Sequence, residues 1–297
     1  MALYFGLVGV QWAELAPHPA MSAMLWLATA FMAFVGAVAT HNLIHAPVFR
    51  VGWMNDALRV LATLWYGHPV SLFVPVHNLS HHRNAQTRRD VTRTTKVRYR
   101  INALNLWFGT RWARAGASLY RDFMADQRAS GTKLWVQFRR ELVVLMVYLV
   151  VLAWLSPVKV VAFVLLPHLF GQFAIKAVNF VQHDGCDYDP GGYNHSRNFV
   201  GSWLNWWFMN NGYHTIHHMR PGAHWSGLPE LHAKLVAPEI HPALEVEDAL
   251  VYLWRTFVWP GERLMYDGRP FEFPADEGED LPWYEPVRSS KEQAGIA

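Results

Sequence analysis

The sequence predicts an all-α integral membrane protein, with three or four transmembrane helices and a cytoplasmic helical cap that carries clusters of histidine. Three observations predict this class: long apolar runs, a basic segment between them, and histidines at helical spacing. Of the 297 residues, 52% are hydrophobic and only 16% are charged, against about 25% charged residues in soluble domains. The chain also holds 15 Trp residues, and Trp favours the membrane–water interface.

Three apolar runs are predicted to cross the bilayer. Met21–Thr40 has about the 20 residues that a crossing helix needs. Leu142–Leu155 and Val160–Val181 are predicted to form a helical hairpin with its turn at Ser156–Lys159. Ala2–Val10 is apolar but short, and it either spans or lies in the interface. Whether residues 2–16 span is therefore open, which leaves a count of three or four helices.

The stretch Trp53–Val76 is apolar on average but is not predicted to cross. It contains Asp56 and Arg59, and charges inside a span are costly. It also contains Pro69 and Pro75, which remove helix hydrogen bonds. We therefore expect an interfacial or re-entrant segment.

Basic residues are concentrated between the apolar runs. Arg83–Arg140 holds 14 Lys and Arg residues against three Asp, which places this segment on the cytoplasmic face by the positive-inside rule. Topology alone is one explanation. The other is a docking surface for an acidic redox protein or for phosphate groups. The position between apolar runs argues against a nucleic-acid partner, and we expect a bacterial inner membrane or its equivalent.

Residues 1–270 are predicted to form a single membrane domain. Residues 271–297 carry seven acids against two bases, a composition that predicts a flexible acidic tail. Cys186 is the only cysteine, so an intrachain disulfide and a cysteine-based zinc site are excluded.

Nine of the 16 histidines fall in four short segments. Residues three or four apart share one face of a helix. The histidines can therefore point toward one place within each of three sets, namely His41/His45, His77/His81 and His214/His217/His218. The nine candidate metal ligands are His41, His45, His77, His81, His82, His183, His214, His217 and His218.

Nine imidazoles are enough for two metal ions. Neutral imidazole suits Fe, Zn, Cu and Ni, and a single zinc site takes only three or four protein ligands. Two metals with open positions can bind and activate O2. The four segments can converge only if they lie on one face of the membrane, so Trp53–Val76 must return to the face it left.

The order of these segments resembles the membrane fatty acid desaturase/hydroxylase superfamily. The sequence reads HNLIH at 41–45, HNLSHH at 77–82 and HTIHH at 214–218, and the resemblance covers residues 40–232. It is closest in pattern to acyl-lipid or acyl-CoA desaturases. In the acyl-CoA branch a similar Asn-x-x-x-His pattern implies that His183 binds iron and that Asn179 holds a metal-bound water.

The resemblance implies an O2-dependent desaturase that introduces a double bond into a fatty acyl chain at two non-haem Fe ions. No catalytic residue beyond the metal centre is implied. Three alternatives stay open: a lipid or hydrocarbon hydroxylase or ketolase, an oxidative fatty-acid decarboxylase, and a non-enzymatic membrane protein that stores or senses metal. The chain lacks a haem-binding HPGG signature, so the expected partners are the lipid bilayer, an acyl or other long apolar substrate, and a separate ferredoxin or cytochrome.

Overall fold

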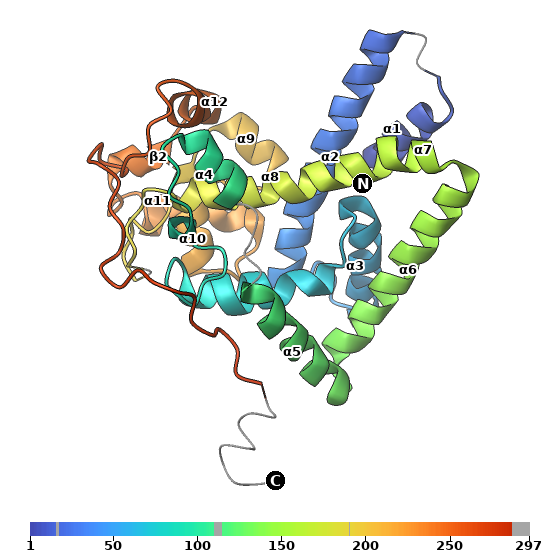
Figure 1. Ribbon diagram of the computed structural model, residues 1–297, viewed down its shortest axis with the longest axis horizontal. Coiled ribbons are helices and arrows are strands. Elements are labelled where there is room, and N and C mark those ends of the chain that lie inside the picture. The colour runs from blue at the N-terminus through green and yellow to red at the C-terminus, as the bar shows by residue number, and fades with distance from the viewer. Residues whose placement is uncertain (16–17, 110–114, 190, 287–297) are drawn as a thin grey trace. The chain divides into compact units, whose positions relative to one another are not determined.

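The structure is a computed structural model that describes residues 1–15, 18–109, 115–189 and 191–286 (Figure 1). The chain is mostly helical and divides into two compact units, each built from two segments. Unit 1 consists of Met1–Phe73 and Thr132–Lys176, and unit 2 consists of Val74–Gly131 and Ala177–Ala297. The single domain over residues 1–270 stays a prediction.

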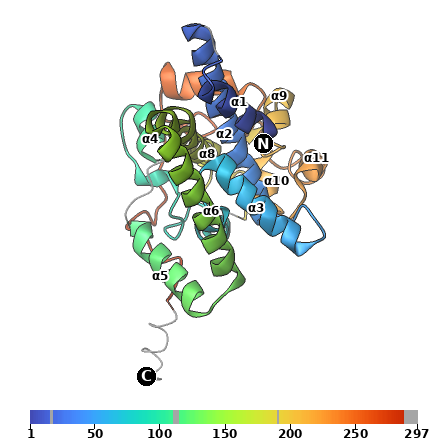
Figure 2. The same cartoon turned by 90° about the vertical axis from the view of Figure 1, so that its right-hand side faces the viewer.

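Unit 1 contains the long apolar helices. Helix α3 packs against both α2 and α6 (Figure 2). The elements of this unit are α1 (Ala2–Trp12), α2 (Pro19–His45), α3 (Gly52–Tyr66), the 3-10 helix η1 (Val70–Leu72), α6 (Lys133–Leu155), α7 (Pro157–Val160), the π-helix η4 (Val161–Leu165) and the first part of α8 (Leu166–His183).

Among the residues that the structure describes, two stretches are long and apolar enough to cross a membrane, namely α2 and the continuous Pro157–His183. Helix α6 has 23 residues, but Arg139, Arg140 and Glu141 precede its apolar part. The uncharged remainder, Leu142–Leu155, is only about 21 Å long, against about 30 Å of hydrocarbon. The number of spans therefore stays a prediction.

The turn of the predicted hairpin is present. Ser156 ends α6 and begins α7, its Oγ accepts a hydrogen bond from the Lys159 N–H at 3.4 Å, and Pro157 occupies the first turn. Proline fits there because the first N–H groups of a helix have no partner within it. Figure 1 shows the sharp change of direction between α6 and α7.

Trp53–Val76 is not one continuous helix. Helix α3 ends at Gly67, whose φ is +73°. A Cβ at this position would lie 2.2 Å from the His168 ring, so glycine is required for both reasons. The chain then forms η1, where the Ser71 N–H donates to Glu141 Oε2 of α6 at 2.8 Å. The return of this segment to its original face stays a prediction.

Unit 2 is built from short helices and a two-stranded parallel sheet, in which Asn198 pairs with Glu245. Ile216, Leu228, Val236 and Leu244 form a buried cluster. The elements are η2 (Pro75–His82), η3 (Thr94–Lys96), α4 (Asn102–Gly109), α5 (Ala115–Ala129), the end of α8, β1 (Asn198–Phe199), α9 (Ser202–Trp207), α10 (His214–Met219), η5 (Trp225–Gly227), α11 (Leu228–Leu235), η6 (Pro242–Leu244), β2 (Glu245–Val246), α12 (Ala249–Leu253) and η7 (Trp254–Val258).

The acidic C-terminal segment contacts a basic loop of the same unit. The Asp280 carboxylate pairs with Arg93 and, at 2.8 Å, with Lys96. Glu277 lies 3.2 Å from the guanidinium of Arg93, and Trp283 is buried. Residues 277–283 therefore have defined contacts, whereas residues 287–297 of the predicted flexible tail lie outside the described residues.

Candidate metal centre

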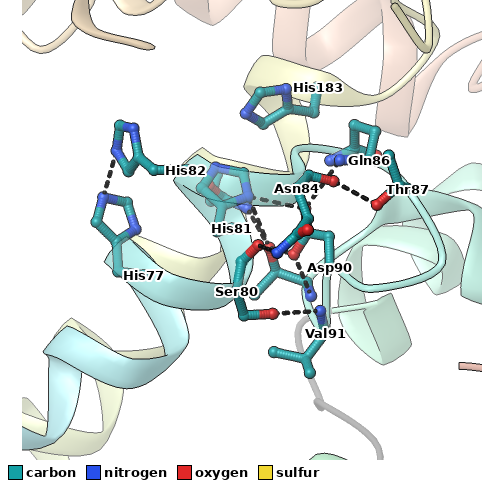
Figure 3. A network of polar contacts seen from close by, with 12 residues as sticks. His77, Ser80, His81, His82, Asn84, Gln86, Thr87, Asp90, Val91 and His183 are labelled. Carbon is teal, nitrogen blue, oxygen red and sulfur yellow. Dashed lines mark hydrogen bonds and ion pairs between the residues drawn. The ribbon is translucent and has the colours of Figure 1, made fainter. Parts of the chain in front are cut away.

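The histidines of the second segment lie on a π-helix, η2. In a π-helix the backbone hydrogen bonds join residues five apart, and such turns are frequent at functional sites. The wider turn brings His77 and His82 together, with their Nε2 atoms 3.0 Å apart (Figure 3). This differs from the pairing of His77 with His81 that α-helical spacing predicts.

Helix α10 presents the last three histidines. His214 and His218 are one α-helical turn apart, and their Nε2 atoms lie 3.2 Å from each other. His217 points elsewhere, because neighbouring residues on a helix differ in direction by about 100°. Its Nε2 lies 3.0 Å from that of His82. The three-histidine group of unit 2 is therefore His77, His82 and His217.

The remaining histidines of unit 2 form a second group. The Nε2 atoms of His183 and His214 are 3.0 Å apart. One ligand nitrogen from each member lies within 4.8 Å of all the others. This four-histidine group consists of His81, His183, His214 and His218. Each adjacent histidine pair, at 81–82 and at 217–218, thus gives one imidazole to each group.

The ring of His81 is fixed by its Nδ1 atom. This atom lies 2.9 Å from Asp90 Oδ2 and 3.0 Å from Thr92 Oγ1. A carboxylate only accepts hydrogen bonds, so Nδ1 carries the hydrogen and Nε2 of the neutral ring is a lone pair. His81 Nε2 is buried and has no hydrogen-bond partner in the described part of the chain. A metal ion is the partner that such a lone pair fits.

Asp90 is a buried residue of the site that the histidine spacing does not reveal. It accepts hydrogen bonds from the N–H groups of Gln86 at 3.0 Å and Thr92 at 2.8 Å. Burial alone raises the pKa of this carboxyl, but His81 and the two N–H groups outweigh it and lower the pKa below the ordinary value. The one signal in the sequence is an acid and a threonine about ten residues after His81.

His183 is fixed in the same way by a backbone oxygen. Its Nδ1 donates to the carbonyl of His195 at 3.0 Å, so its Nε2 is also a lone pair. The next residue, Asp184, forms a buried ion pair with Arg263. Arg263 also donates to the Val97 carbonyl at 2.6 Å, which joins the end of α8 to the loop after η3.

Asn179 lies one helical turn before His183 and donates to Thr92 Oγ1 at 3.4 Å. Because Thr92 also contacts His81, the amide is linked to the four-histidine group through a hydroxyl. The metal-bound water that the resemblance implies for Asn179 stays a prediction.

The surroundings of His183 and His218 favour the neutral form of their imidazoles. Burial, followed by the neighbouring rings of His82 and His214, lowers the pKa of His218 well below its ordinary value. Neutral imidazole is the form that binds metal. His183 and His218 therefore need not lose a proton before they bind a metal ion.

His41 and His45 belong to unit 1. They lie on the last turn of α2, with ring centroids 5.0 Å apart, so the predicted common face of this segment is confirmed. A metal centre shared by His41, His45 and the histidines of unit 2 stays a prediction.

Unit 2 alone thus brings together seven of the nine predicted ligands. They form two groups of nitrogen donors that could hold metal ions. The class defined by fold and site is a mostly helical protein with two candidate membrane spans in its described part and with histidine clusters that could hold metal ions.

Comparison with known proteins gives the family. Residues 17–246 match the family model of fatty acid desaturases, and the chain belongs to the fatty acid desaturase family. It is therefore an oxidoreductase with a desaturase-like function in general. The search of curated proteins and the search of solved structures each gave no match.

Proposed function

We propose that this protein is an O2-dependent desaturase that introduces a double bond into a fatty acyl chain at a histidine-ligated di-iron centre. The observation that carries the proposal is the four-histidine group, which includes the buried, unpartnered lone pair of His81 Nε2 among the described residues. The three-histidine group lies beside it in the same unit, since His81 and His82 are consecutive. We propose that His41 and His45 complete this second group.

The donor set fits iron. Imidazole nitrogen suits iron, whereas zinc has no redox chemistry. Cys186 does not compete as a ligand, because its thiol is buried and donates to the Gln182 carbonyl at 3.6 Å. Two iron ions bound to these histidines would supply the oxidising power that removes hydrogen from two neighbouring methylenes. The balanced reaction takes one O2, two electrons and two protons, and it yields the double bond and two waters.

The protein's own residues hold the imidazoles still and exclude water. Asp90, Thr92 and the carbonyl of His195 fix the tautomer of two ligands. Such anchoring contacts orient metal ligands and raise their basicity. His81 and His183 are fully buried, so bulk water is kept from their imidazoles. A dry site of this kind is what an oxidant formed from O2 would need.

We propose that a separate ferredoxin or cytochrome delivers the electrons and docks on the cytoplasmic face. Arg83 follows His82 directly and is exposed, as is Arg89. Arg93 and Lys96 are paired with acids of the C-terminal segment, so the docking surface we propose centres on Arg83 and Arg89. Exposed basic residues speed the encounter with an acidic partner.

The experiment is expression in a host with simple saturated lipids, followed by mass spectrometry of total lipids. We expect a new acyl species that is lighter by two hydrogens, with one double-bond position and no oxygen from labelled O2. His183→Ala is the inactive control. Label recovered in an alcohol or ketone, or a terminal alkene one carbon shorter, would replace desaturation by one of the alternative oxidations.

A further inference from the structure

His195 is a buried histidine outside the nine candidate ligands, in the loop between α8 and β1, and it is 2% exposed. Its Nδ1 lies 2.7 Å from the carbonyl oxygen of Gly192. A carbonyl only accepts hydrogen bonds, so Nδ1 carries the hydrogen and Nε2 of the neutral ring is a lone pair. This Nε2 is buried and has no hydrogen-bond partner among the residues that the structure describes.

The surroundings of His195 are those of the four-histidine group. Its ring centroid lies 5.5 Å from that of His218. Its own carbonyl accepts the Nδ1 hydrogen bond of His183. His195 thus repeats the arrangement of His81, in which Nδ1 is held by an oxygen and the Nε2 lone pair is left buried without a partner. A buried acceptor without a hydrogen-bond donor destabilises a protein. A bound group that donates a hydrogen bond to His195 Nε2 would remove this penalty.

His195 is nevertheless not a fifth member of the group. The four ligand nitrogens of His81, His183, His214 and His218 lie within 4.8 Å of one another, and His195 is not among them. A group that is buried beside a metal site but outside its ligand set commonly acts through water.

We propose that His195 is a positioning residue whose Nε2 accepts a hydrogen bond from a water ligand of the ion held by the four-histidine group. The inference rests on the proposed function, because it requires an ion in that group. It assigns a role to the side chain of His195 that is separate from the support its backbone carbonyl gives to His183. The open coordination position of the ion would then be oriented by this side chain.

Two substitutions separate the side chain from the loop structure. His195→Asn keeps a donor for the Gly192 carbonyl and the backbone carbonyl for His183, but it has no atom at the position of Nε2. His195→Gln places an amide oxygen at about the distance of Nε2 from the backbone, and it restores an acceptor. The matched control is His224→Asn, because His224 is an exposed histidine of the same unit that contacts Ser226 Oγ at 2.7 Å.

The measurement uses Co²⁺ as a spectroscopic probe, in purified full-length protein. The visible absorption bands report the coordination of the ion, and competition with a chelator gives its affinity. We expect His195→Asn to shift the bands and to weaken Co²⁺ binding about 10–100-fold. His195→Gln should recover part of both, and His224→Asn should match the wild type.

A His195→Asn protein with wild-type bands and affinity would overturn the role of the side chain while leaving the metal centre in place. A His195→Gln protein no closer to the wild type than His195→Asn would contradict it as well, provided that both are folded by circular dichroism. Absence of Co²⁺ binding to the wild type at neutral pH would instead overturn the proposed metal centre, and with it this inference.

Discussion

The Asp90–His81 contact determines which nitrogen of a buried imidazole is offered to a metal. Asp90 is fully buried, and its two carboxylate oxygens accept hydrogen bonds from His81 Nδ1, the Thr92 hydroxyl and the Gln86 N–H. The negative charge also makes the imidazole a better electron donor. A single side chain therefore sets both the tautomer and the basicity of one ligand.

Asp90→Asn should weaken iron binding about 10–100-fold, because the amide keeps the shape but loses the charge. The affinity can be measured by competition with a chelator on purified protein. The control is Asp248→Asn, since Asp248 is an exposed residue of the same unit that caps α12, and asparagine caps helices equally well. Equal iron retention in the Asp90 variant and the control would remove Asp90 from the site.

The identity of the candidate ligands could be predicted from sequence, but their pairing could not. Clustering in four short segments singled out nine histidines, and seven of them meet in unit 2. The pairing of His77 with His82 depends on the π-helix η2. Tertiary structure determines this helix type, and the sequence shows no periodic pattern that predicts it. Asp90 and His195 were missed as site residues because their contacts come from loops.

At the scale of elements, an acidic C-terminal segment is held on a basic loop. The Arg93 side chain is 4% exposed and contacts Asp280, Glu277 and the Gly278 carbonyl. The Arg88 Nε donates to the Glu279 carbonyl at 2.8 Å. A buried guanidinium needs such partners, because an unpaired charge inside a protein is strongly unfavourable.

Asp280→Asn should therefore lower the midpoint of thermal unfolding. Loss of the charge weakens the ion pairs that Asp280 forms with Arg93 and Lys96. The free energy of unfolding should fall by about 1–3 kcal/mol, which lowers the midpoint by roughly 2–10 °C. Circular dichroism in detergent measures the shift. Asp276→Asn changes an exposed acid of the same segment, and it should leave the midpoint unchanged. Identical midpoints for the two variants would show that the segment contributes no stability.

Long apolar helices can be predicted from sequence composition, whereas the structure of short polar segments depends on their tertiary contacts. The predicted run Met21–Thr40 lies within α2, and the turn predicted at Ser156–Lys159, between two apolar runs, is present. The predicted flexible tail rested on charge and proline content alone. Sequence composition does not show that Arg93 is buried and needs carboxylates, so the contacts of Asp280 could not be foreseen.

At the scale of the whole molecule, the proposal requires one membrane face for all histidine segments. Cysteines introduced at the exposed Arg83 and Arg128 should react with an impermeant reagent from the cytoplasmic side, and one at Val158, which is 76% exposed, from the other side. The background is Cys186→Ser. The native thiol should not interfere even where it is kept, because burial raises the pKa of Cys186 to about 12. Labelling of the cysteines at positions 83 and 158 from the same side would contradict a single membrane face for all histidine segments.

The most direct test of the di-iron centre is the iron content of anaerobically purified protein, read together with its Mössbauer spectrum. We expect about two iron ions per chain in histidine coordination, without haem or acid-labile sulfide. His183→Ala and His217→Ala, one from each group, should both lose iron. His241→Ala, which alters an exposed histidine, should keep it. A single iron or zinc per chain, or full iron content in the His183→Ala protein, would contradict the account.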